Sequence, residues 1–331
     1  MNYKIISVKN LHENIEYYRN FATQIVAVVK ADAYGHGVRV VAEALEGKVD
    51  YFAVFSPQEA KNLSKIVPNA KIIILSHVSN FALIDKYYLT ATTLADVKKA
   101  ILRGATNRCF IKLSAGMNRF GIDCKNQNTL EKLKKLIKNY DFAGFSLHFS
   151  TNSCFKCAQK EFASFLEAKA QLGVNYPVCF GGSHAKNFAC DILRVGIGMY
   201  GYGEKGLKKV MTTEGEVLSV RSLEKGEKAG YEGAFKAKRR TNIAIVSVGY
   251  GDGFVRDSRN WKCSINGKKY KIIAPLNMDT FMLDVTGSDV KVGDRVSICD
   301  DYDVYCKFCH GNIYETLTRM SLFRGKTIKR N

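Results

Sequence analysis

Apolar positions over residues 25–198 fall into short, β-branched runs that alternate with segments of helical period. The runs predict eight strands, at 25–30, 51–55, 71–76, 87–93, 108–113, 142–149, 177–180 and 192–198. Helical spacing follows several of them, as at 38–47, 57–66, 94–104 and 157–172. Strands alternating with helices indicate a parallel sheet, and eight such units favour a closed, TIM-like (β/α)₈ barrel over an open doubly wound sheet. No GxGxxG follows the first strand, which counts against a dinucleotide-binding fold.

The pattern changes after residue 206. Short β-branched runs separated by glycine turns occupy 210–223, 242–254, 270–287 and 290–299, with hardly any helical period. This pattern of short strands and turns is typical of a mainly-β domain. The α/β chain is therefore predicted to have two domains, a barrel over 1–206 and a β-rich domain over 207–331.

Composition narrows the class of protein. The chain has 331 residues, 46% of them hydrophobic, which is enough for a sizeable core. Residues 1–20 contain no apolar core of signal-peptide length, and nowhere do eighteen apolar residues run together. We therefore expect a cytoplasmic protein that does not bind membranes.

The ten cysteines fit reduced thiols better than a disulfide framework. Cys154 and Cys157 form one CxxC pair, and Cys306 and Cys309 form another. The pairs lie about 150 residues apart, whereas structural zinc sites keep their halves closer in sequence. No metal site is predicted, although metal binding by these pairs stays open.

The formal net charge of +19 is the strongest anomaly of composition. A basic face could bind nucleic acid through its phosphates. However, the lysines and arginines are scattered over 130–140, 206–210, 235–240 and 267–271 and do not form one stripe with interleaved aromatic residues. Solvated basic faces and no nucleic-acid partner are expected, with a nucleic-acid-binding protein kept as the alternative from another class.

The first strand carries the clearest candidate chemistry, because it runs directly into Lys30 and then into the polar segment ADAYGHG. The carboxyl ends of barrel strands are where active sites lie. A lysine there is costly to bury as an ammonium, so it must be deprotonated, paired or covalently used. The alternative is a strand-end lysine that reaches solvent.

The segment KADAYGHG at 30–37 closely resembles the cofactor lysine motif of alanine racemases, in which the lysine holds pyridoxal 5'-phosphate (PLP) as a Schiff base. The resemblance covers nearly the whole chain. Its other motifs are KLSAGMNRFGI at 112–122, SLHFS at 146–150, GGSHAKN at 181–187, LRVGIGMYG at 193–201, KAGYEGAF at 228–235 and NIYETLTRMSLFRG at 312–325. It implies interconversion of L- and D-alanine for peptidoglycan.

The resemblance also implies a role for each site residue. Lys30 and Tyr231 would be the two catalytic bases. The cofactor would be bound by Lys30, Tyr34, His148, Ser183, Arg194, Gly196, Ile197 and Tyr314, and the substrate by Arg119, Met278 and Asp279. Lys112 falls where many members of the family have a carbamylated lysine. Taken alone, His148 could be a core histidine and Tyr231 a buried tyrosine of the β domain.

The family's sites are shared between subunits, so a homodimer is implied. Four residues depart from the family's pattern, namely Ser114, Ala115, Gly182 and Asn277. They bear on the substrate carboxylate and leave open a racemase of broader specificity, acting on serine or other small amino acids. A PLP carrier is disfavoured by the β-rich domain, and a fold-related decarboxylase by the absence of a Cys-Glu-Gly-Asp motif.

Overall fold

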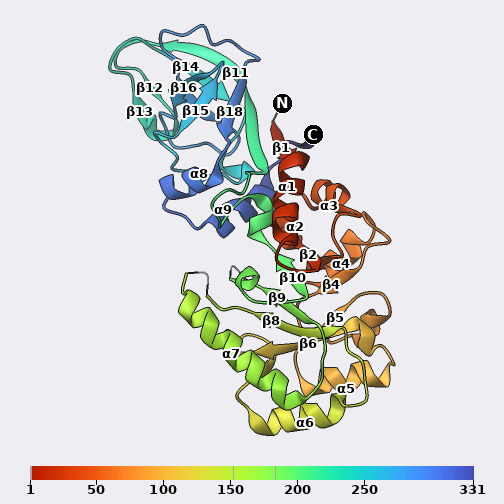
Figure 1. Ribbon diagram of the computed structural model, residues 1–331. Helices are drawn as coiled ribbons and strands as arrows, with labels where there is room; N and C mark the ends of the chain where they lie inside the picture. The colour runs from red at the N-terminus through yellow and green to blue at the C-terminus, as the bar shows by residue number, and fades with distance from the viewer. Residues whose placement is uncertain (1, 152, 183) are drawn as a thin grey trace. The chain divides into compact units, whose positions relative to one another are not determined.

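The computed structural model describes residues 2–151, 153–182 and 184–331 (Figure 1). The chain divides into two compact units. The barrel unit comprises His12–Lys30 and Ala42–Leu207, and the β unit comprises Met1–Leu11, Ala31–Val41 and Lys208–Asn331. The domain boundary between 206 and 207 stays a prediction. The compact units differ from the predicted domains because two N-terminal segments, Met1–Leu11 and Ala31–Val41, group with the β unit.

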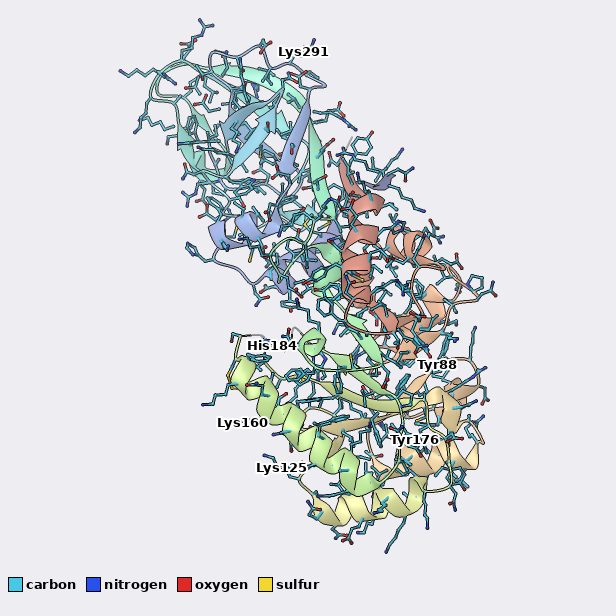
Figure 2. The ribbon with its side chains drawn as sticks, viewed as in Figure 1. Tyr88, Lys125, Lys160, Tyr176, His184 and Lys291 are labelled. Atoms are coloured by element: carbon cyan, nitrogen blue, oxygen red, sulfur yellow. A yellow bond between two sulfur atoms is a disulfide. The ribbon has the colours of Figure 1, made fainter. Side chains whose placement is uncertain are left out.

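Eight parallel strands form the barrel unit, in the spatial order β4-β3-β2-β10-β9-β8-β6-β5. An isolated parallel bridge between Ile73 and Tyr88 links β4 to β5, so the barrel is nearly closed. Figure 2 labels Tyr88 at this junction. The strands are β2 (Gln24–Val28), β3 (Tyr51–Val54), β4 (Ile72–Ile74), β5 (Leu89–Ala91), β6 (Cys109–Ser114), β8 (Gly144–His148), β9 (Val178–Gly181) and β10 (Ile192–Val195), with the short β7 (Ile122–Asp123) beside β6. The predicted TIM-like barrel is confirmed.

The connections between the barrel strands do not all contain an α-helix, as eight repeated β/α units would require. The helices are α1 (Val8–Arg19), α3 (Val38–Leu45), α4 (Pro57–Leu63), α5 (Leu94–Leu102), α6 (Gln127–Ile137) and α7 (Phe155–Leu172). Capping boxes at Ser56 and Thr93 start α4 and α5. After β4, β9 and β10 the chain forms only the short 3₁₀ turns η1 (Phe81–Asp85), η3 (Ala185–Asn187) and η4 (Ile197–Tyr200). In the described part of the motif at 181–187, the only helical element is the single turn η3.

The barrel core is built from strands that are buried along their whole length. All four residues of β3 and all six of β6 are buried, as expected for strands covered on both faces. Polar side chains interrupt this core at adjacent positions of neighbouring strands. Lys112 on β6 is in register with Ser146 on β8, and Ser146 is in register with Cys179 on β9. These residues begin the polar lining of the barrel.

The β unit is a mainly antiparallel sheet in the order β16-β15-β18-β11-β1-β19, with β14 and β17 continuing from β11. Its strands are β1 (Tyr3–Ser7), β11 (Met211–Leu223), β14 (Thr241–Val246), β15 (Lys262–Ile265), β16 (Lys268–Lys271), β17 (Phe281–Asp284), β18 (Arg295–Cys299) and β19 (Lys326–Arg330). β1 pairs antiparallel with β11 and parallel with β19. The predicted mainly-β region is confirmed, and its first strand comes from the N-terminus.

Three shorter elements complete the β unit. The hairpin of β12 (Lys228–Ala229) and β13 (Phe235–Lys236) carries the 3₁₀ turn η5 (Tyr231–Gly233). Near the C-terminus, α8 (Tyr302–Phe308) and α9 (Ile313–Arg319) are helices that the sequence pattern did not predict. Within the described ranges, no helix is long and apolar enough to cross a bilayer.

The cysteines differ from the expectation of reduced thiols at one place. Cys154 and Cys157 form a disulfide, while the other eight cysteines are free. In the described part of the chain, no group of three or more His, Cys, Asp or Glu side chains could hold a metal ion. Cys306 and Cys309, the second CxxC pair, therefore lack further protein ligands there.

Candidate active site

Lys30 lies two residues after the last residue of β2, at the carboxyl end of the barrel strand, where it is half-buried. Burial lowers the pKa of its amine, and the positive charges of Arg119 and Arg194 lower it further. Glu59 acts in the opposite direction, but burial is the largest effect. A larger neutral fraction is what an amine needs to react with an aldehyde.

Lys30 belongs to a cluster of cations at this end of the barrel, which includes Lys112, Arg119 and Arg194. Lys112 is only 8% exposed on β6. Burial lowers the pKa of its amine to about 7, helped by the charges of Arg194, Arg119 and Lys30. Lys30, Arg119 and Arg194, together with the charged fraction of Lys112, repel one another and favour an anionic ligand among them, such as a phosphate or a carboxylate.

Arg194 on β10 is buried and held by neighbouring strands. One terminal nitrogen donates to Ser146 Oγ at 2.5 Å and lies 3.3 Å from the Cys179 carbonyl oxygen, and the other donates to the Leu147 carbonyl at 2.7 Å. Gly181 permits this placement, because a Cβ there would lie 2.8 Å from Arg194 Nε. The guanidinium is thus fixed before any ligand arrives.

His148 ends β8 and is half-buried. Burial lowers the pKa of its imidazole to about 3, and Arg194, Lys112, Arg119 and Lys30 contribute in that order. The ring is therefore neutral at physiological pH and can offer one donor and one acceptor.

The lowered pKa of His148 predicts a dependence of stability on pH. The unfolded chain binds a proton on this histidine below about pH 6.5, while the folded chain does not until about pH 3. Stability is therefore lost as the pH falls through this window, by at most about 1.4 kcal/mol per pH unit for one proton. His148→Gln should flatten the slope of unfolding free energy against pH by up to that amount, measured by urea unfolding between pH 6.5 and 4. An unchanged slope would contradict the assignment of this titration to His148.

Arg119 lies on the loop after β6, and its side chain is exposed. Its guanidinium carbon lies 5.9 Å from the centre of the Phe120 ring. Asn118 adopts a left-handed φ of 51°, and Gly121 has a φ of 120° close to the Lys112 backbone. The backbone therefore turns on both sides of Arg119, at Asn118 and at Gly121.

The candidate phosphate loops follow β9 and β10. Ser183 lies outside the described residues. Gly182 before it has a φ of 111°, and a Cβ there would lie 3.1 Å from the Phe149 carbonyl oxygen. Gly196 is half-buried and Ile197 is buried at the start of η4. In the described part of the chain, His184 Nε2 is buried without a hydrogen-bond partner beside these loops.

Four consecutive left-handed residues follow Lys30 in the β unit. Ala31, Asp32, Ala33 and Tyr34 have φ values of 52–54°, which costs about 1–2 kcal/mol per residue. The turn is held by Asp32, which accepts from Val38 N–H at 2.7 Å. Strain of this kind is concentrated at functional sites.

Further contacts fix the end of this left-handed turn. The buried Lys4 amine donates to the carbonyl oxygens of Gly35 at 2.8 Å and Met320 at 3.1 Å. Gly35 packs against the Leu317 carbonyl so closely that no Cβ fits. Tyr34 is buried, with its ring centre 6.4 Å from that of Tyr314 on α9. Both predicted cofactor tyrosines therefore lie together within the β unit.

Tyr231 begins η5 in the β12–β13 hairpin, and 74% of it is exposed. The hairpin turns sharply around it, since Gly230, Glu232 and Gly233 have φ values of 80°, 57° and 69°. An expectation of a buried tyrosine in the β domain is therefore wrong for this residue. Within this single chain, the β unit presents the phenol to its surface.

Met278 and Asp279 lie in an exposed loop of the β unit. Asp279 accepts from Arg324 Nη1 at 2.6 Å, and Arg324 also binds the buried carboxylate of Asp252 at 3.0 Å. The Met278 carbonyl accepts from Gly251 N–H at 2.9 Å. The Asp279 carboxylate is therefore already paired, which limits what it can offer a substrate.

Several residues that shape the site were missed by the sequence interpretation. Glu59 influences Lys30, Ser146 fixes Arg194, and Arg324 pairs with Asp279. The capping box SPQE contained a signal for Glu59. Ser146 stands among apolar residues of a buried strand, where a polar side chain needs a partner. Arg324 lies in the motif at 312–325, but nothing in that segment indicates its pairing with Asp279.

The barrel holds Lys30 near two arginines at the ends of its strands. This arrangement is typical of an enzyme that binds an anionic ligand and uses a reactive amine. Two family models match the chain, the alanine racemase N-terminal domain over residues 6–204 and the alanine racemase C-terminal domain over 210–323. The chain belongs to the alanine racemase family.

Individual relatives agree with the family models. The alanine racemase of Thermodesulfovibrio yellowstonii is 33% identical over 292 residues, covering 82% of this chain and 79% of that protein. Among solved structures, alanine racemase of Clostridium difficile has a TM-score of 0.89 at 25% identity, covering 99% of this chain and 95% of the other. Alanine racemase from Bartonella henselae, solved with covalently bound pyridoxal phosphate, has a TM-score of 0.84 at 26% identity and covers 99% of both chains.

Proposed function

We propose that this chain is an isomerase that interconverts L- and D-alanine with PLP, using Lys30 and Tyr231 as its two bases. The observation that carries the proposal is the half-buried Lys30, whose pKa is lowered by burial and by Arg119 and Arg194 at the end of β2. The alanine racemase models that cover both parts of the chain support the reaction.

The residues fit PLP in chemical terms. Its phosphate and phenolic oxygen are anionic, and the cluster of Lys30, Lys112, Arg119 and Arg194 supplies the complementary charge. We propose that Lys30 attaches to the cofactor and that Arg194 faces its ring nitrogen. The remaining proposed ligands are Tyr34, His148, Ser183, Gly196, Ile197 and Tyr314. When bound, PLP supplies an electron sink that makes the α-proton of alanine acidic.

Racemisation requires one proton to leave one face of Cα and another to arrive at the opposite face. Lys30 would exchange the proton of D-alanine and Tyr231 the proton of L-alanine. Arg119 is proposed to bind the substrate carboxylate, with Met278 and Asp279 nearby in the substrate site. Because a guanidinium keeps its proton in proteins, Arg194 would leave the ring nitrogen unprotonated and suppress side reactions such as transamination.

A homodimer with shared sites is part of the proposal. Tyr231 is exposed on its hairpin, and a general base is effective only when it is positioned and shielded from water. A second copy of the chain would provide that cover, with the hairpin of one subunit completing the site of the other. A monomer should therefore be inactive.

Carbamylation of Lys112 is also proposed. A carbamate forms from a neutral amine and CO₂, and a pKa of about 7 leaves much of this amine neutral under physiological conditions. The resulting negative charge would relieve the repulsion among Lys112, Arg119 and Arg194. We further propose that the enzyme works in the cytoplasm and supplies D-alanine for peptidoglycan.

Incubation with single L-amino acids tests the proposed reaction. The purified protein with PLP should convert L-alanine to an equal mixture of enantiomers, read by chiral chromatography. We expect L-serine to react at least about tenfold more slowly, since one added polar group in a small pocket changes discrimination by 1–3 kcal/mol. Equal or faster conversion of serine would favour the broader racemase, and no D-amino acid from any substrate would contradict the proposal.

A further inference from the structure

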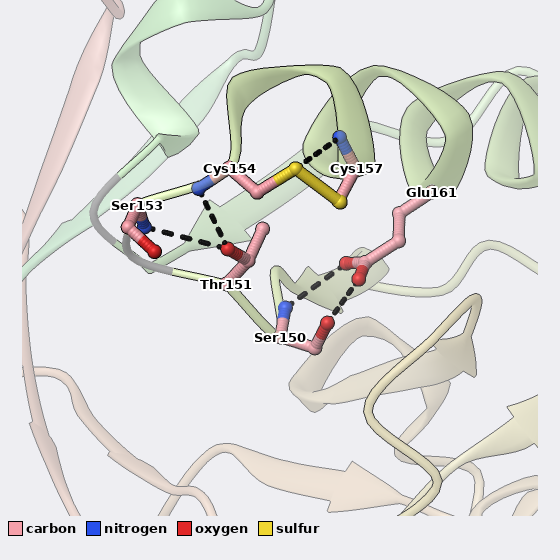
Figure 3. Close-up of a disulfide and its surroundings, with 6 residues drawn as sticks. All are labelled: Ser150, Thr151, Ser153, Cys154, Cys157 and Glu161. Atoms are coloured by element: carbon pink, nitrogen blue, oxygen red, sulfur yellow. Dashed lines mark hydrogen bonds between the residues drawn. A yellow bond between two sulfur atoms is a disulfide. The ribbon is translucent and has the colours of Figure 1, made fainter.

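The Cys154–Cys157 disulfide closes the first turn of α7, an 18-residue helix (Figure 3). The two Cα atoms are 5.3 Å apart, and Cys154 is the N-cap residue of the helix. Its Sγ accepts the backbone N–H of Cys157 at 3.2 Å. Cys157 is an exposed residue, whereas Cys154 is half-buried.

The first turns of α7 contact three loops at the carboxyl ends of the barrel strands. Glu161 accepts the Ser150 N–H at 2.9 Å and also the Ser150 hydroxyl, on the loop after β8 (Figure 3). The same carboxylate packs against Gly116, on the Arg119 loop, so closely that a Cβ would not fit. These contacts connect the start of α7 to the loops that follow His148 and precede Arg119.

The third contact is aromatic. The Phe155 ring lies 5.8 Å from those of His184 and Phe188, on the loop after β9. Figure 2 labels His184. Phe155 lies between Cys154 and Cys157 in the sequence, so it belongs to the turn that the disulfide closes. Phe155 therefore connects the turn that the disulfide closes to the segment next to the candidate phosphate loop.

We propose that Cys154 and Cys157 form a redox-active site that exchanges electrons with dithiols and disulfides, and whose oxidised form orders these three loops. A structural role is a weaker explanation, because a disulfide across three residues closes a very short loop and removes little entropy from the unfolded chain. CxxC pairs at helix N-termini favour the thiolate and so undergo exchange.

The exchange balances with a dithiol as reductant. One thiolate of the dithiol attacks Cys157 Sγ, breaks the bond to Cys154 and leaves the electron pair on Cys154 Sγ, which takes up a proton. This step leaves a mixed disulfide between the reductant and Cys157. The second thiolate of the reductant then attacks the reductant sulfur of that mixed disulfide, which closes the reductant to a cyclic disulfide and releases the Cys157 thiolate to take up a proton. Two electrons and two protons pass to the protein. The Cys157 N–H stabilises the departing Cys154 thiolate.

Mass spectrometry of the whole protein tests the redox site. In buffers of reduced and oxidised dithiothreitol, alkylation followed by mass analysis should show Cys154 and Cys157 switching together and reversibly between thiol and disulfide. Deuterium uptake over 153–161, 116–121 and 184–188 should accelerate by about fivefold or more on reduction, which corresponds to loss of about 1 kcal/mol of local stability. Equal uptake in the two states would overturn the proposed coupling, and permanently free thiols would overturn the site.

Two double variants separate this pair from the other cysteines. Cys154→Ser with Cys157→Ser should show the fast uptake in either buffer. Cys306→Ser with Cys309→Ser is the matched control, because that CxxC pair is free, and it should respond to reduction as the wild-type protein does. If the control lost the response and the first variant kept it, the wrong pair would have been assigned.

The coupling to cofactor binding rests on the proposed function. The dissociation constant of PLP, measured by equilibrium dialysis, should rise roughly fivefold or more when the wild-type protein is reduced. If neither the oxidised nor the reduced protein bound PLP, the proposed function would be wrong. The deuterium-uptake experiment would still decide whether Cys154 and Cys157 form a redox site. An equal dissociation constant in both states would overturn the coupling alone.

Discussion

Replacing Lys30 with alanine should abolish covalent attachment of PLP and lower racemisation by at least about 10⁴-fold. The variant removes an attachment point and a base, and a positioned base alone contributes roughly 10² to 10⁴. Among the other lysines of the barrel end, Lys112 lies within strand β6 and not after its end. Attachment is measured by borohydride reduction and mass analysis, and activity by chiral chromatography.

Lys98→Ala is a matched control, since Lys98 is an exposed lysine on α5 and should leave both readouts unchanged. A Lys30→Ala protein that kept a borohydride-reducible adduct and full activity would remove Lys30 from the proposal. If methylamine partly restored activity, the result would support a chemical and not only a structural role for the missing amine.

Tyr231→Phe should lower racemisation by about 10² to 10⁴-fold while PLP attachment stays intact. The change removes one oxygen from a side chain that is 74% exposed, so the fold should not be disturbed. Tyr140→Phe is the control, because Tyr140 is an exposed tyrosine of the barrel unit outside the candidate site. Loss of PLP attachment in Tyr231→Phe would show that the residue does not act as a base alone.

Shared sites add a consequence for mixtures of inactive variants. A dimer of one Lys30→Ala and one Tyr231→Phe subunit would contain one site with both defects and one with neither. Activity should therefore reappear, to about a quarter of the wild-type value if subunits exchange at random. Failure to complement after demonstrated subunit exchange would contradict the shared site.

The barrel was predictable because its strands are buried on both faces. Runs such as 25–30 and 108–113 therefore read as nearly continuous apolar segments. β1 was not predicted, since its five residues are stabilised by β11 and β19, which lie far away in sequence. α8 and α9 are seven residues each, which is too short for a clear helical period.

Part of the candidate site was equally accessible from sequence. Lys30 and His148 stand at or near the ends of predicted strands, and Arg194 lies within the last predicted strand, so a barrel topology brings them toward one another. The left-handed turn at 31–34 was not predicted, because four non-glycine residues with positive φ have no local signal. The pairing of Asp279 with Arg324 depends on tertiary contacts between distant segments.

Proton exchange on single enantiomers in heavy water tests the two-base assignment most directly. With the Tyr231→Phe protein, NMR should show D-alanine losing its α-proton to solvent at a rate near that of the wild-type protein, through Lys30. L-alanine should exchange about 10² to 10⁴-fold more slowly, since its base is missing. Equal exchange rates on L- and D-alanine would contradict the assignment of Lys30 and Tyr231 to opposite faces of the substrate.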